Sequence, residues 1–596
     1  MSEADRKSFQ NNWIPGLIIL AAILLRFIAL GSTPLSENEA DLALQSLSIS
    51  NGISDFNVTQ PLYVMVTSVL FKFFGANDFT ARTFPAFMGL LIVCLPVLFR
   101  QELGCRKMIL LTFFLAVDPV GIAWSKTADG IIPVICLLGL TAYEYKRKRN
   151  IAGNLLLSLA MTGGERFWPA AAALFVAGAI MAGISRKFVS TGRLPFLWLK
   201  DVFSKKNLCL LIVFWLLFSV GMFGFPSGLN TIGQGFLNGF RTIPGHDFRP
   251  AGTFPILLAL FFYLGPGIIL FILRFIRMIK MGQFPTILLM SGIILFGILL
   301  AGFQQGILLL SWLSIPLYYF AAESLIWLAD SIRIEKNLYS ALAVAIPLCL
   351  FSFLVFRIAE LLQMGDPSLP LSFTWNEQLW TIPLTRLQGY LIIFVICILI
   401  FGFFIPYLLN YFSPGNIRPG LVSGCLIIIL GGILTNSWAA AGFRLPGNDP
   451  AARKNDSRHE LILGVQVNQT DQPIFDMIHE IGIKQNGFEN GADGLILVPE
   501  DSMLRWELHN YPNIRFSEVL NLQTEKPSYV ITDSDESAVL SKEYAGMPFN
   551  WKTRDEWYAY SKTDWLKWIM YRITNDRYSP LTFWQESRWL TDNIQK

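Results

Sequence analysis

Four acidic residues follow closely on the first hydrophobic stretch of the chain and could do chemistry there. They are Glu37, Glu39, Asp41 and Asp55. A carboxylate can act as a general base toward a hydroxyl group, and clustered carboxylates also suit hard cations. Their position beside a membrane exit predicts either chemistry on a lipid-borne substrate or the handling of cations.

The segment that holds these acids runs from residue 31 to residue 81 and has two halves. The acidic half predicts a loop and a short helix. The second half, Pro61 to Phe74, is apolar and aromatic, but it is too short to cross a bilayer, which takes ~20 apolar residues. We therefore expect this half to form a helix that lies in the membrane interface.

Composition places the chain among polytopic membrane proteins. Of its 596 residues, 53% are hydrophobic and only 15% are charged, whereas a soluble domain carries about 25% charged residues. No cysteine follows Cys425, so the polar C-terminal part has no disulfide framework and no cysteine-based metal site. The histidines stand at unrelated spacings and predict no recognisable metal site.

Hydropathy predicts about thirteen membrane spans. They cover residues 13–31, 83–100, 108–124, 128–144, 151–164, 167–185, 208–225, 254–273, 284–302, 305–329, 338–357, 387–410 and 419–437. The first span is expected to be retained, because no clear signal-peptide cleavage site follows it.

Lysine and arginine gather in every second loop, as in the run from Lys146 to Arg149. Loops of this kind stay in the cytoplasm. The N-terminus is therefore expected in the cytoplasm. The first outer loop, 32–81, and everything after about residue 438 are expected outside.

We expect a membrane domain at 1–440. Residues 445–596 are expected to form a separate extracytoplasmic α/β domain. Short strands are expected at 462–467, 495–498, 514–516 and 529–532, and helices at 472–484 and 501–510. Alternating strands and helices are typical of a partly parallel sheet. The tail from Trp551 is dense in Trp and Tyr, and we favour packing and membrane anchoring over stacking on sugars.

Glu37 and Glu39 are two residues apart, so on a helix only one of them would point into a cavity. We favour Glu39 as a base, with Glu37 second. The spacing Ser36-x-x-Glu39 is also that of a capping box at a helix start. Both explanations stay open for Glu39.

Asp129 begins a predicted span, and an ionisable residue at that depth is a candidate for function. The alternatives are an ion pair with Lys126 or a cap on the helix that starts there. Arg82 lies at the entry to the second span. We expect it either to bind phosphate or to extend its side chain to the membrane interface. In the long loop 226–253, His246 and Arg249 are candidates for contact with a donor or a metal.

Several short motifs, taken in order, resemble a known family of membrane enzymes. They are Asn38-Glu39-Ala40, Gln60-Pro-Leu-Tyr63, Asp78-Phe-Thr-Ala-Arg82, and Ser125-Lys126 followed by Asp129. This set resembles the GT-C class of membrane glycosyltransferases, in particular glycosyltransferase family 39, the protein-mannosyltransferase-like family. Within it, the chain is most similar to the flippase-activity-associated branch of archaea and bacteria.

The resemblance implies an all-α polytopic bundle with interfacial helices in the first outer loop. It implies transfer of a sugar from a polyprenyl-phosphate-linked donor to a protein, lipid or glycan acceptor on the outer face. Membrane lipid is then a partner, and nucleic acid is not. No cofactor is implied, although the clustered acids leave a divalent cation open.

The motifs and the charged residues noted above together give the candidate site. The candidate catalytic residues are Glu39, Glu37 and Asp129; the candidate donor-phosphate-binding residues are Lys126, Arg82 and Arg249; further site-lining candidates are Asn38, Asp41, Gln60 and His246.

Two departures from the family pattern open an alternative function. Asn38 stands where the family has its first acid, and an amide cannot take a proton from a hydroxyl at neutral pH. Lys126 stands in place of arginine, which keeps the charge but loses the bidentate phosphate fork. The alternative is a catalytically degenerate homologue that acts as a membrane scaffold or complex subunit. A transporter is disfavoured, because the spans hold few charges and no repeated halves.

Overall fold

The structure is a computed structural model of the full chain, and only part of the chain is described here. The described residues are 13–52, 58–188, 204–223, 227–240, 253–302, 306–331, 370–375, 378–385, 414–442, 466–467, 472–498, 501–517, 526–533, 544–555 and 576–586, with isolated residues between them.

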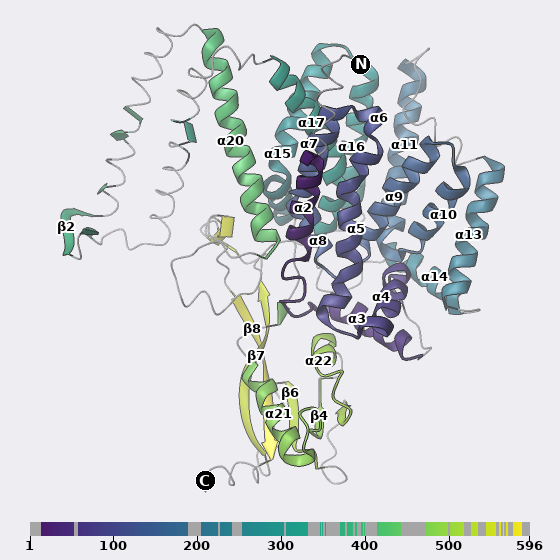
Figure 1. The fold of residues 1–596 in the computed structure, drawn as a ribbon, viewed down its shortest axis with the longest axis vertical. Helices are drawn as coiled ribbons and strands as arrows, with labels where there is room; N and C mark the ends of the chain where they lie inside the picture. Colours follow the sequence, from purple (N-terminus) through teal and green to yellow (C-terminus); the bar gives the residue numbers. More distant parts are fainter. Residues whose placement is uncertain are drawn as a thin grey trace.

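A bundle of helices forms the larger part of the molecule (Figure 1). Its long elements are α2 (Trp13–Phe27), α5 (Asp78–Leu98), α7 (Cys105–Ala116), α8 (Pro119–Ser125), α9 (Ile131–Lys146), α10 (Asn150–Met161), α11 (Trp168–Phe188), α13 (Lys205–Phe223), α14 (Ser227–Phe240), α15 (Thr253–Lys280), α16 (Phe284–Gly302), α17 (Leu309–Ser331) and α20 (Pro414–Ala440). Short turns of helix, α6 (Arg100–Leu103), η1 (Gly164–Arg166) and η2 (Gly306–Leu308), lie between them.

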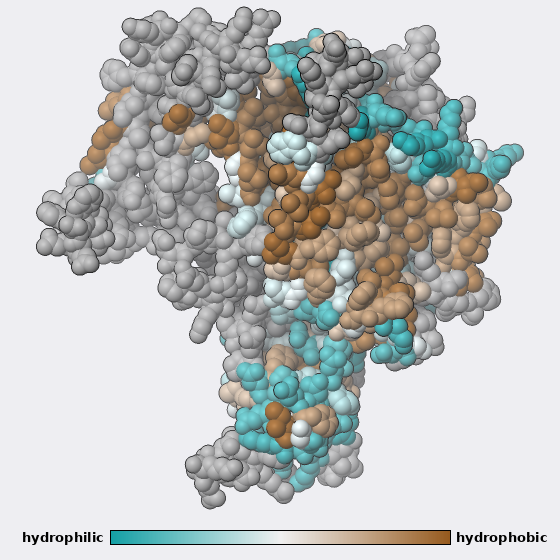
Figure 2. All heavy atoms as spheres, viewed as in Figure 1, coloured by the Kyte–Doolittle hydropathy of each residue, from teal (hydrophilic) through white to brown (hydrophobic). Residues whose placement is uncertain are grey.

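Six of the described helices are long and apolar enough to cross a membrane, and a seventh crossing results if the bent pair α7 and α8 counts as one span. A broad apolar band runs across the helices in Figure 2, as expected of a multi-pass membrane protein. The total of about thirteen spans stays a prediction. The expected spans at 338–357 and 387–410 lie almost wholly outside the described residues.

The predicted span at 108–124 is a broken helix. α7 and α8 meet at an angle of 54°. Pro119 is the first residue of α8, a position that suits proline because its missing N–H would have no helical partner there. The break leaves carbonyl groups of α7 and amide groups of α8 to be satisfied by other elements.

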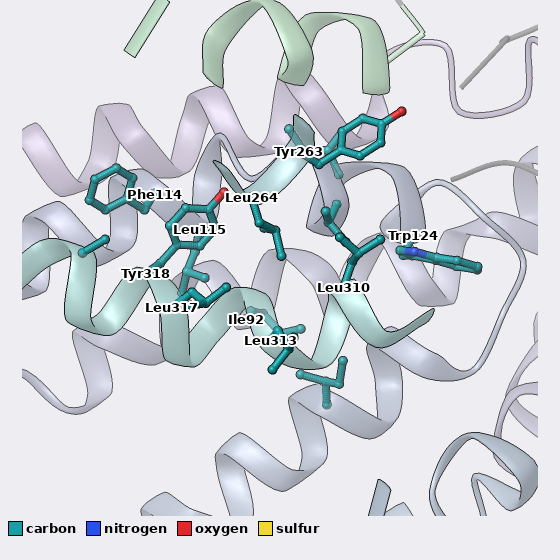
Figure 3. Close-up of a cluster of buried hydrophobic side chains, with 14 of the residues drawn as sticks. Ile92, Phe114, Leu115, Trp124, Tyr263, Leu264, Leu310, Leu313, Leu317 and Tyr318 are labelled. Carbon is teal, nitrogen blue, oxygen red and sulfur yellow. The ribbon is translucent and has the colours of Figure 1, made fainter. Parts of the chain in front are cut away.

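The core of the bundle is apolar and aromatic where α17 packs against α7, α8 and α15. Leu310, Leu313 and Leu317 recur at helical spacing on α17, and Tyr318 follows them (Figure 3). The Tyr318 ring stacks on Phe114 of α7 with a centroid distance of 5.3 Å. This packing holds the broken span against the rest of the bundle.

Two short helices cover one end of the bundle: α3 (Glu37–Ser50) and α4 (Pro61–Phe74). The expected interfacial helix at 61–74 is therefore confirmed as a helix. Its Tyr63 is fully buried, while Phe73 and Phe74 are exposed. Tyr63 Oη donates to the carbonyl of Ala81 at 2.8 Å, which joins α4 to the start of α5.

The C-terminal part forms a mixed six-stranded sheet beyond this end of the bundle (Figure 1). Its strand order is β3-β7-β8-β6-β4-β5, with bounds β3 (Gln466–Val467), β4 (Gly494–Ile496), β5 (Ile514–Phe516), β6 (Tyr529–Asp533), β7 (Tyr544–Asp555) and β8 (Asp576–Glu586). β4 is parallel to β5 and β6, and the other pairs are antiparallel. Two helices, α21 (Gln472–Asn486) and α22 (Ser502–Glu507), accompany the sheet. We call this part the sheet domain.

The sheet domain agrees with the expected partly parallel sheet in its first half. In its second half, β7 and β8 form a long antiparallel pair that the sequence did not predict. Trp568 is fully buried and packs on Phe262 of α15, with ring centroids 5.2 Å apart. A separate antiparallel hairpin, β1 (Pro370–Trp375) and β2 (Gln378–Thr385), lies within the expected loop 358–386.

Candidate functional site

Glu39 and Arg82 form a buried ion pair where α3 meets the start of α5. Arg82 Nε donates to Glu39 Oε1 at 2.8 Å, and Arg82 Nη2 donates to Oε2 at 3.0 Å. Both side chains are almost completely buried, at 3% and 7% exposure. The contact is bidentate, which is the strong form of an arginine–carboxylate pair.

Three further donors reach the same carboxylate. The Ser36 backbone N–H and hydroxyl both donate to Oε2 at 2.9 Å, and the Ala128 backbone N–H donates to Oε1 at 2.7 Å. The capping box expected from Ser36-x-x-Glu39 is therefore present. Burial alone would raise the pKa of the Glu39 carboxyl, but Arg82 and these hydrogen bonds hold that pKa below its usual value. We call Glu39 and its donors the Glu39 socket.

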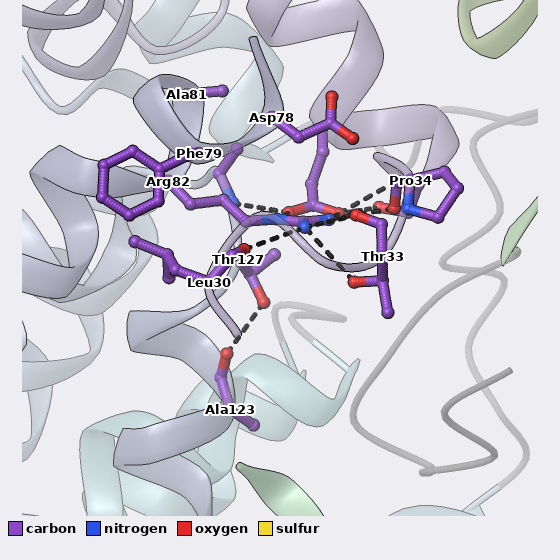
Figure 4. Close-up of polar contacts among 12 residues, drawn as sticks. Leu30, Thr33, Pro34, Asp78, Phe79, Ala81, Arg82, Ala123 and Thr127 are labelled. Carbon is purple, nitrogen blue, oxygen red and sulfur yellow. Dashed lines mark hydrogen bonds and ion pairs between the residues drawn. The ribbon is translucent and has the colours of Figure 1, made fainter. Parts of the chain in front are cut away.

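Arg82 also fixes the chain that leads into α3. Its Nη1 donates to the carbonyl of Thr33 at 2.6 Å, and its Nη2 donates to that of Pro34 at 3.0 Å. Figure 4 shows the guanidinium aimed at this segment, with Leu30, Thr33 and Pro34 around it. The side chain does not reach outward to the interface, which was one of the two expectations for Arg82.

Asp129 lies at the start of α9 and pairs with Arg166 of η1. Arg166 Nη2 donates to Oδ2 at 2.7 Å, and Arg166 Nε donates to both oxygens. The Ile131 backbone N–H, the first of α9, donates to Oδ1 at 2.8 Å, but the N-cap residue of α9 is Gly130. Of the two structural alternatives, the ion pair is made with Arg166 in place of Lys126.

Gln60 connects this ion pair to a second acid. Its amide nitrogen donates to Asp129 Oδ2 at 3.2 Å and to Glu165 Oε1 at 3.1 Å. Its amide oxygen accepts from the Gly130 backbone N–H at 2.6 Å. Gln60 is buried at the start of α4, so it ties the predicted interfacial helix to the start of α9.

Lys126 is buried at the end of α8 and donates to two distant carbonyl groups. Its Nζ lies 2.6 Å from the carbonyl oxygen of Ile28 and 2.6 Å from that of Ala441. These carbonyls lie just beyond the C-terminal ends of α2 and α20, where a positive charge is favourable. Lys126 therefore joins two spans that are far apart in the sequence.

The turn 126–130 connects all these contacts. Lys126 binds the ends of α2 and α20, Ala128 donates to Glu39, Asp129 binds Arg166, and Gly130 donates to Gln60. Lys126 and Asp129 of the turn, and Glu39 and Arg166 beside it, are thus all hydrogen-bonded at this turn. Buried charges are costly unless they are paired, so these contacts hold the turn in place.

The remaining acids of α3 are more accessible. Glu37 is 31% exposed and lies 3.3 Å from Nζ of Lys552 on β7. Asp41 accepts from Gln45, one turn later, at 2.8 Å. Asn38, between the two glutamates, is half-buried. The α3 acids therefore differ in how far they are buried: Glu39 is almost completely buried and Glu37 is not.

The sheet domain docks on this region through polar and aromatic contacts. Lys552 also lies 3.2 Å from Oδ2 of Asp501. Trp506 of α22 donates from Nε1 to Asp78 Oδ1 at 2.7 Å and stacks on Phe71 of α4. Burial, followed by the charge of Asp78, raises the pKa of Glu507 to about 7.

Two predicted site residues, His246 and Arg249, lie outside the described residues. Among the residues that are described, no three His, Cys, Asp or Glu side chains come together as a metal-binding group. The divalent cation therefore has no support from the described part of the chain.

Three charged residues have contacts or positions that the sequence did not predict. Glu165-Arg166 is a pair that could contact a donor or a metal, but the sequence does not indicate that Arg166 binds Asp129. Lys552 lies in a strand that was not expected. Arg26 stands inside the first span, and an ionisable residue within a span is itself a signal for a polar site.

The fold is similar to solved structures of membrane enzymes. ArnT from Cupriavidus metallidurans in the apo state matches with a TM-score of 0.53 and 13% identity over 89% of this chain and 95% of that chain. ArnT bound to undecaprenyl phosphate matches with a TM-score of 0.53 and 14% identity over the same shares. An oligosaccharyltransferase from Archaeoglobus fulgidus, tethered to an acceptor peptide, has a TM-score of 0.40 and 13% identity over 89% of this chain and 70% of that chain.

No protein-family model matches the sequence, and no curated protein matches it. ArnT is a GT-C glycosyltransferase, so the structural match confirms the predicted GT-C fold. The flippase-activity-associated branch stays a prediction.

Proposed function

We propose that the chain transfers a sugar from a polyprenyl-phosphate-linked donor to a protein, lipid or glycan acceptor at the outer face of the membrane. The observation that carries this proposal is the set of charges around the turn 126–130, at the sheet-domain end of a GT-C bundle. A solved structure with this fold binds undecaprenyl phosphate, which is a polyprenyl phosphate. That match supports the class of donor.

The proposed reaction needs a base and a positive environment. The base takes the proton of the acceptor hydroxyl, the acceptor oxygen attacks the anomeric carbon, and the bond from that carbon to the phosphate oxygen breaks. Positive charge then stabilises the departing phosphate. Lys126 and Arg82, both buried at this end of the bundle, are proposed to supply that charge, together with Arg249. A divalent cation is not required in this scheme.

Among the α3 acids, Glu37 is the better base in this geometry. Both oxygens of Glu39 are occupied by five donors, and its lowered pKa makes it a weak proton acceptor. Glu37 is more exposed. We therefore propose Glu37 as the base and Glu39 as a positioning residue, with Asp129 positioning the turn. Asn38, Asp41, Gln60 and His246 are proposed to line the site.

One observation favours a second candidate function. Glu39, which matches the second acid of the family's Asp-Glu pair, has its carboxylate hydrogen-bonded within the protein. Its half-buried neighbour Asn38, at the place of the first acid, is an amide that cannot act as a base. A chain of this kind would keep the fold and the lipid-facing surface without transferring sugar. It would then serve as a membrane scaffold or as a subunit of a complex.

The test is sugar transfer in membranes that contain a radiolabelled pool of polyprenyl-phosphate sugar. Wild type is compared with Glu37→Gln, Glu39→Gln and Asn38→Asp. Glu480→Gln serves as a control, because Glu480 is an exposed acid of α21 that pairs with Lys484. Each variant is also assayed for thermal unfolding in detergent, which separates lost chemistry from lost structure.

The two functions predict different results. If Glu37 is the base, Glu37→Gln lowers transfer by about 100-fold or more while its melting temperature stays near that of Glu480→Gln. Glu39→Gln lowers transfer and melting temperature together. If the wild-type chain transfers no sugar and Asn38→Asp does, the wild-type chain acts as a scaffold. Transfer by Glu37→Gln at the wild-type rate would contradict the assignment of the base.

A further inference from the structure

A small cavity lined by both polar and apolar residues lies in the bundle at the break between α7 and α8. It is bordered by α2, α5, α7, α8, α9 and α17. Its polar lining residues are Arg26, Asp118, Ser125, Ser311 and Ser314. None of these residues has a role in the function proposed above, and the cavity is separate from the Glu39 socket.

Two buried polar atoms in this lining have no partner among the described residues. They are Nε of Arg26 and Oγ of Ser311, and the two residues are 1% and 2% exposed. The other nitrogens of Arg26 are used: Nη2 donates to the carbonyl of Leu115 at 2.9 Å and Nη1 to that of Ala116 at 3.2 Å. A buried donor without an acceptor is costly, most of all where no bulk water can reach it.

Two glycines make the room for the cavity. A Cβ at Gly89 of α5 would lie 3.3 Å from Arg26 Nε and would collide with Ser125 Oγ. A Cβ at Gly121 of α8 would lie 2.8 Å from Asp118 Oδ2. Any larger residue at either position would press on the polar groups of the lining.

The cavity measures about 20 Å³ as the space open to the centre of a water molecule, and a water molecule needs about 10–15 Å³ on this measure together with two to four polar partners. Asp118 accepts from the backbone N–H groups of Val120 and Gly121 and, at 3.4 Å, from the hydroxyl of Tyr318, and it also interacts with the Ser314 side chain. Because the Tyr318 contact is long for a hydroxyl donor, the carboxylate can still accept a further hydrogen bond. We propose that an ordered water molecule occupies this cavity and joins Arg26 to Asp118 and Ser311.

The water completes the polar support of the broken span. Arg26 places its positive charge on the free carbonyls at the end of α7, and Asp118 places its negative charge on the free amides at the start of α8. Each charge matches the helix end that it contacts. The bridge between them fixes α8, and α8 leads directly into the turn 126–130. The water is therefore a structural ligand that acts at a distance on that turn.

Radiolytic hydroxyl labelling of the purified full chain in lipid nanodiscs tests this proposal, because X-rays convert bound water to hydroxyl radicals in place. Ile132 lines the cavity, and its neighbour Ile131 on α9 does not. Both are almost completely buried, at 3% and 1% exposure. We expect oxidation of Ile132 to be several-fold faster than that of Ile131. Equal rates at the two positions would overturn the proposal.

Variants identify the source of the label. Gly89→Ala fills the cavity and is expected to abolish the excess oxidation at Ile132 and to lower the melting temperature. Gly178→Ala is its control, because a Cβ at Gly178 of α11 meets nothing within 4 Å. If Gly89→Ala does not fold, Ser311→Val removes one partner of the water and occupies its space. If a variant that fills the cavity folds and still shows faster oxidation of Ile132 than of Ile131, the proposal is also overturned, because the water would then lie elsewhere.

Discussion

The Glu39 socket and the cavity at the α7–α8 break are two buried charged sites with opposite hydrogen-bond balance. In the socket, Glu39 accepts five hydrogen bonds from Arg82, Ser36 and Ala128. In the cavity, Arg26 Nε and Ser311 Oγ have no partner among the described residues. The Glu39 carboxylate is therefore saturated by donors of the protein itself, whereas the cavity needs water.

This difference indicates what each site does. A carboxylate that is saturated with donors holds its surroundings in place but gives up its strength as a base. The same logic assigns Glu39 to positioning and leaves the more exposed Glu37 for chemistry. A buried site with free donors instead selects a small polar ligand.

The largest effect is expected from breaking the socket. Arg82→Met leaves Glu39 charged and buried, and removal of one partner from a buried pair costs about 3–5 kcal/mol. The free energy of unfolding can be measured by SDS titration in mixed micelles. Arg106→Met is the control, because the Arg106–Asp330 pair is 79% and 60% exposed and such pairs contribute about 0–1 kcal/mol.

The double variant Glu39→Gln/Arg82→Met sharpens this prediction. Because the two residues contact each other, the double variant is expected to lose less stability than the sum of the single variants. If Arg82→Met loses no more than Arg106→Met, the socket is not a stabilising element.

A smaller loss is expected from Arg166→Lys. Lysine keeps the charge beside Asp129 but cannot reproduce the two-nitrogen contact of Arg166, and loss of a charged hydrogen bond costs about 1–3 kcal/mol. The same micelle titration measures it, with Arg106→Lys as the control. An equal effect of the two substitutions would show that the bidentate contact adds nothing.

Glu39 and Glu507 are expected to give opposite dependences of stability on pH. The pKa of Glu39 is lowered in the folded state, so its contribution is present above the unfolded pKa of about 4.3 and is lost as the pH falls through the folded value. The pKa of Glu507 is raised to about 7. Its contribution is therefore present below about pH 4.3 and is lost as the pH rises through about 7.

Melting temperatures measured across this range test both signs. Glu507→Gln is expected to flatten the decline between about pH 4.3 and 7, while Glu39→Gln leaves that decline unchanged. A decline that persists in Glu507→Gln would assign it to another group.

The smallest effect is expected from Lys552→Met. This lysine joins Glu37 of α3 to Asp501 of the sheet domain at 3.3 and 3.2 Å. Glu37 is partly exposed, and such pairs contribute about 0–1 kcal/mol, while the buried Asp501 keeps the Leu504 N–H and the Trp551 Nε1–H as donors. Hydrogen exchange is expected to rise in α3 and at the start of α22, with little change in the melting temperature. Unchanged exchange in both helices would show that the bridge does not hold the sheet domain.

The sequence alone was enough to predict the features that depend on near neighbours. Hydropathy over a window of residues located the helices from α2 to α17, and the apolar run at 61–74 gave α4. The spacing Ser36-x-x-Glu39 gave the capping box. Short strands such as β4 and β6 followed from their apolar runs. These signals are local, because backbone hydrogen bonds and side-chain periodicity act within a few residues.

Only the tertiary structure decided which charges meet. Arg82 lies 43 residues from Glu39, Arg166 lies 37 residues from Asp129, and Lys126 lies 315 residues from the carbonyl of Ala441. The break after α7 and the pairing of β7 with β8 likewise depend on distant elements. A buried charge must take whatever partner the packing brings to it, and that choice is made by the arrangement of the helices, not by spacing along the chain.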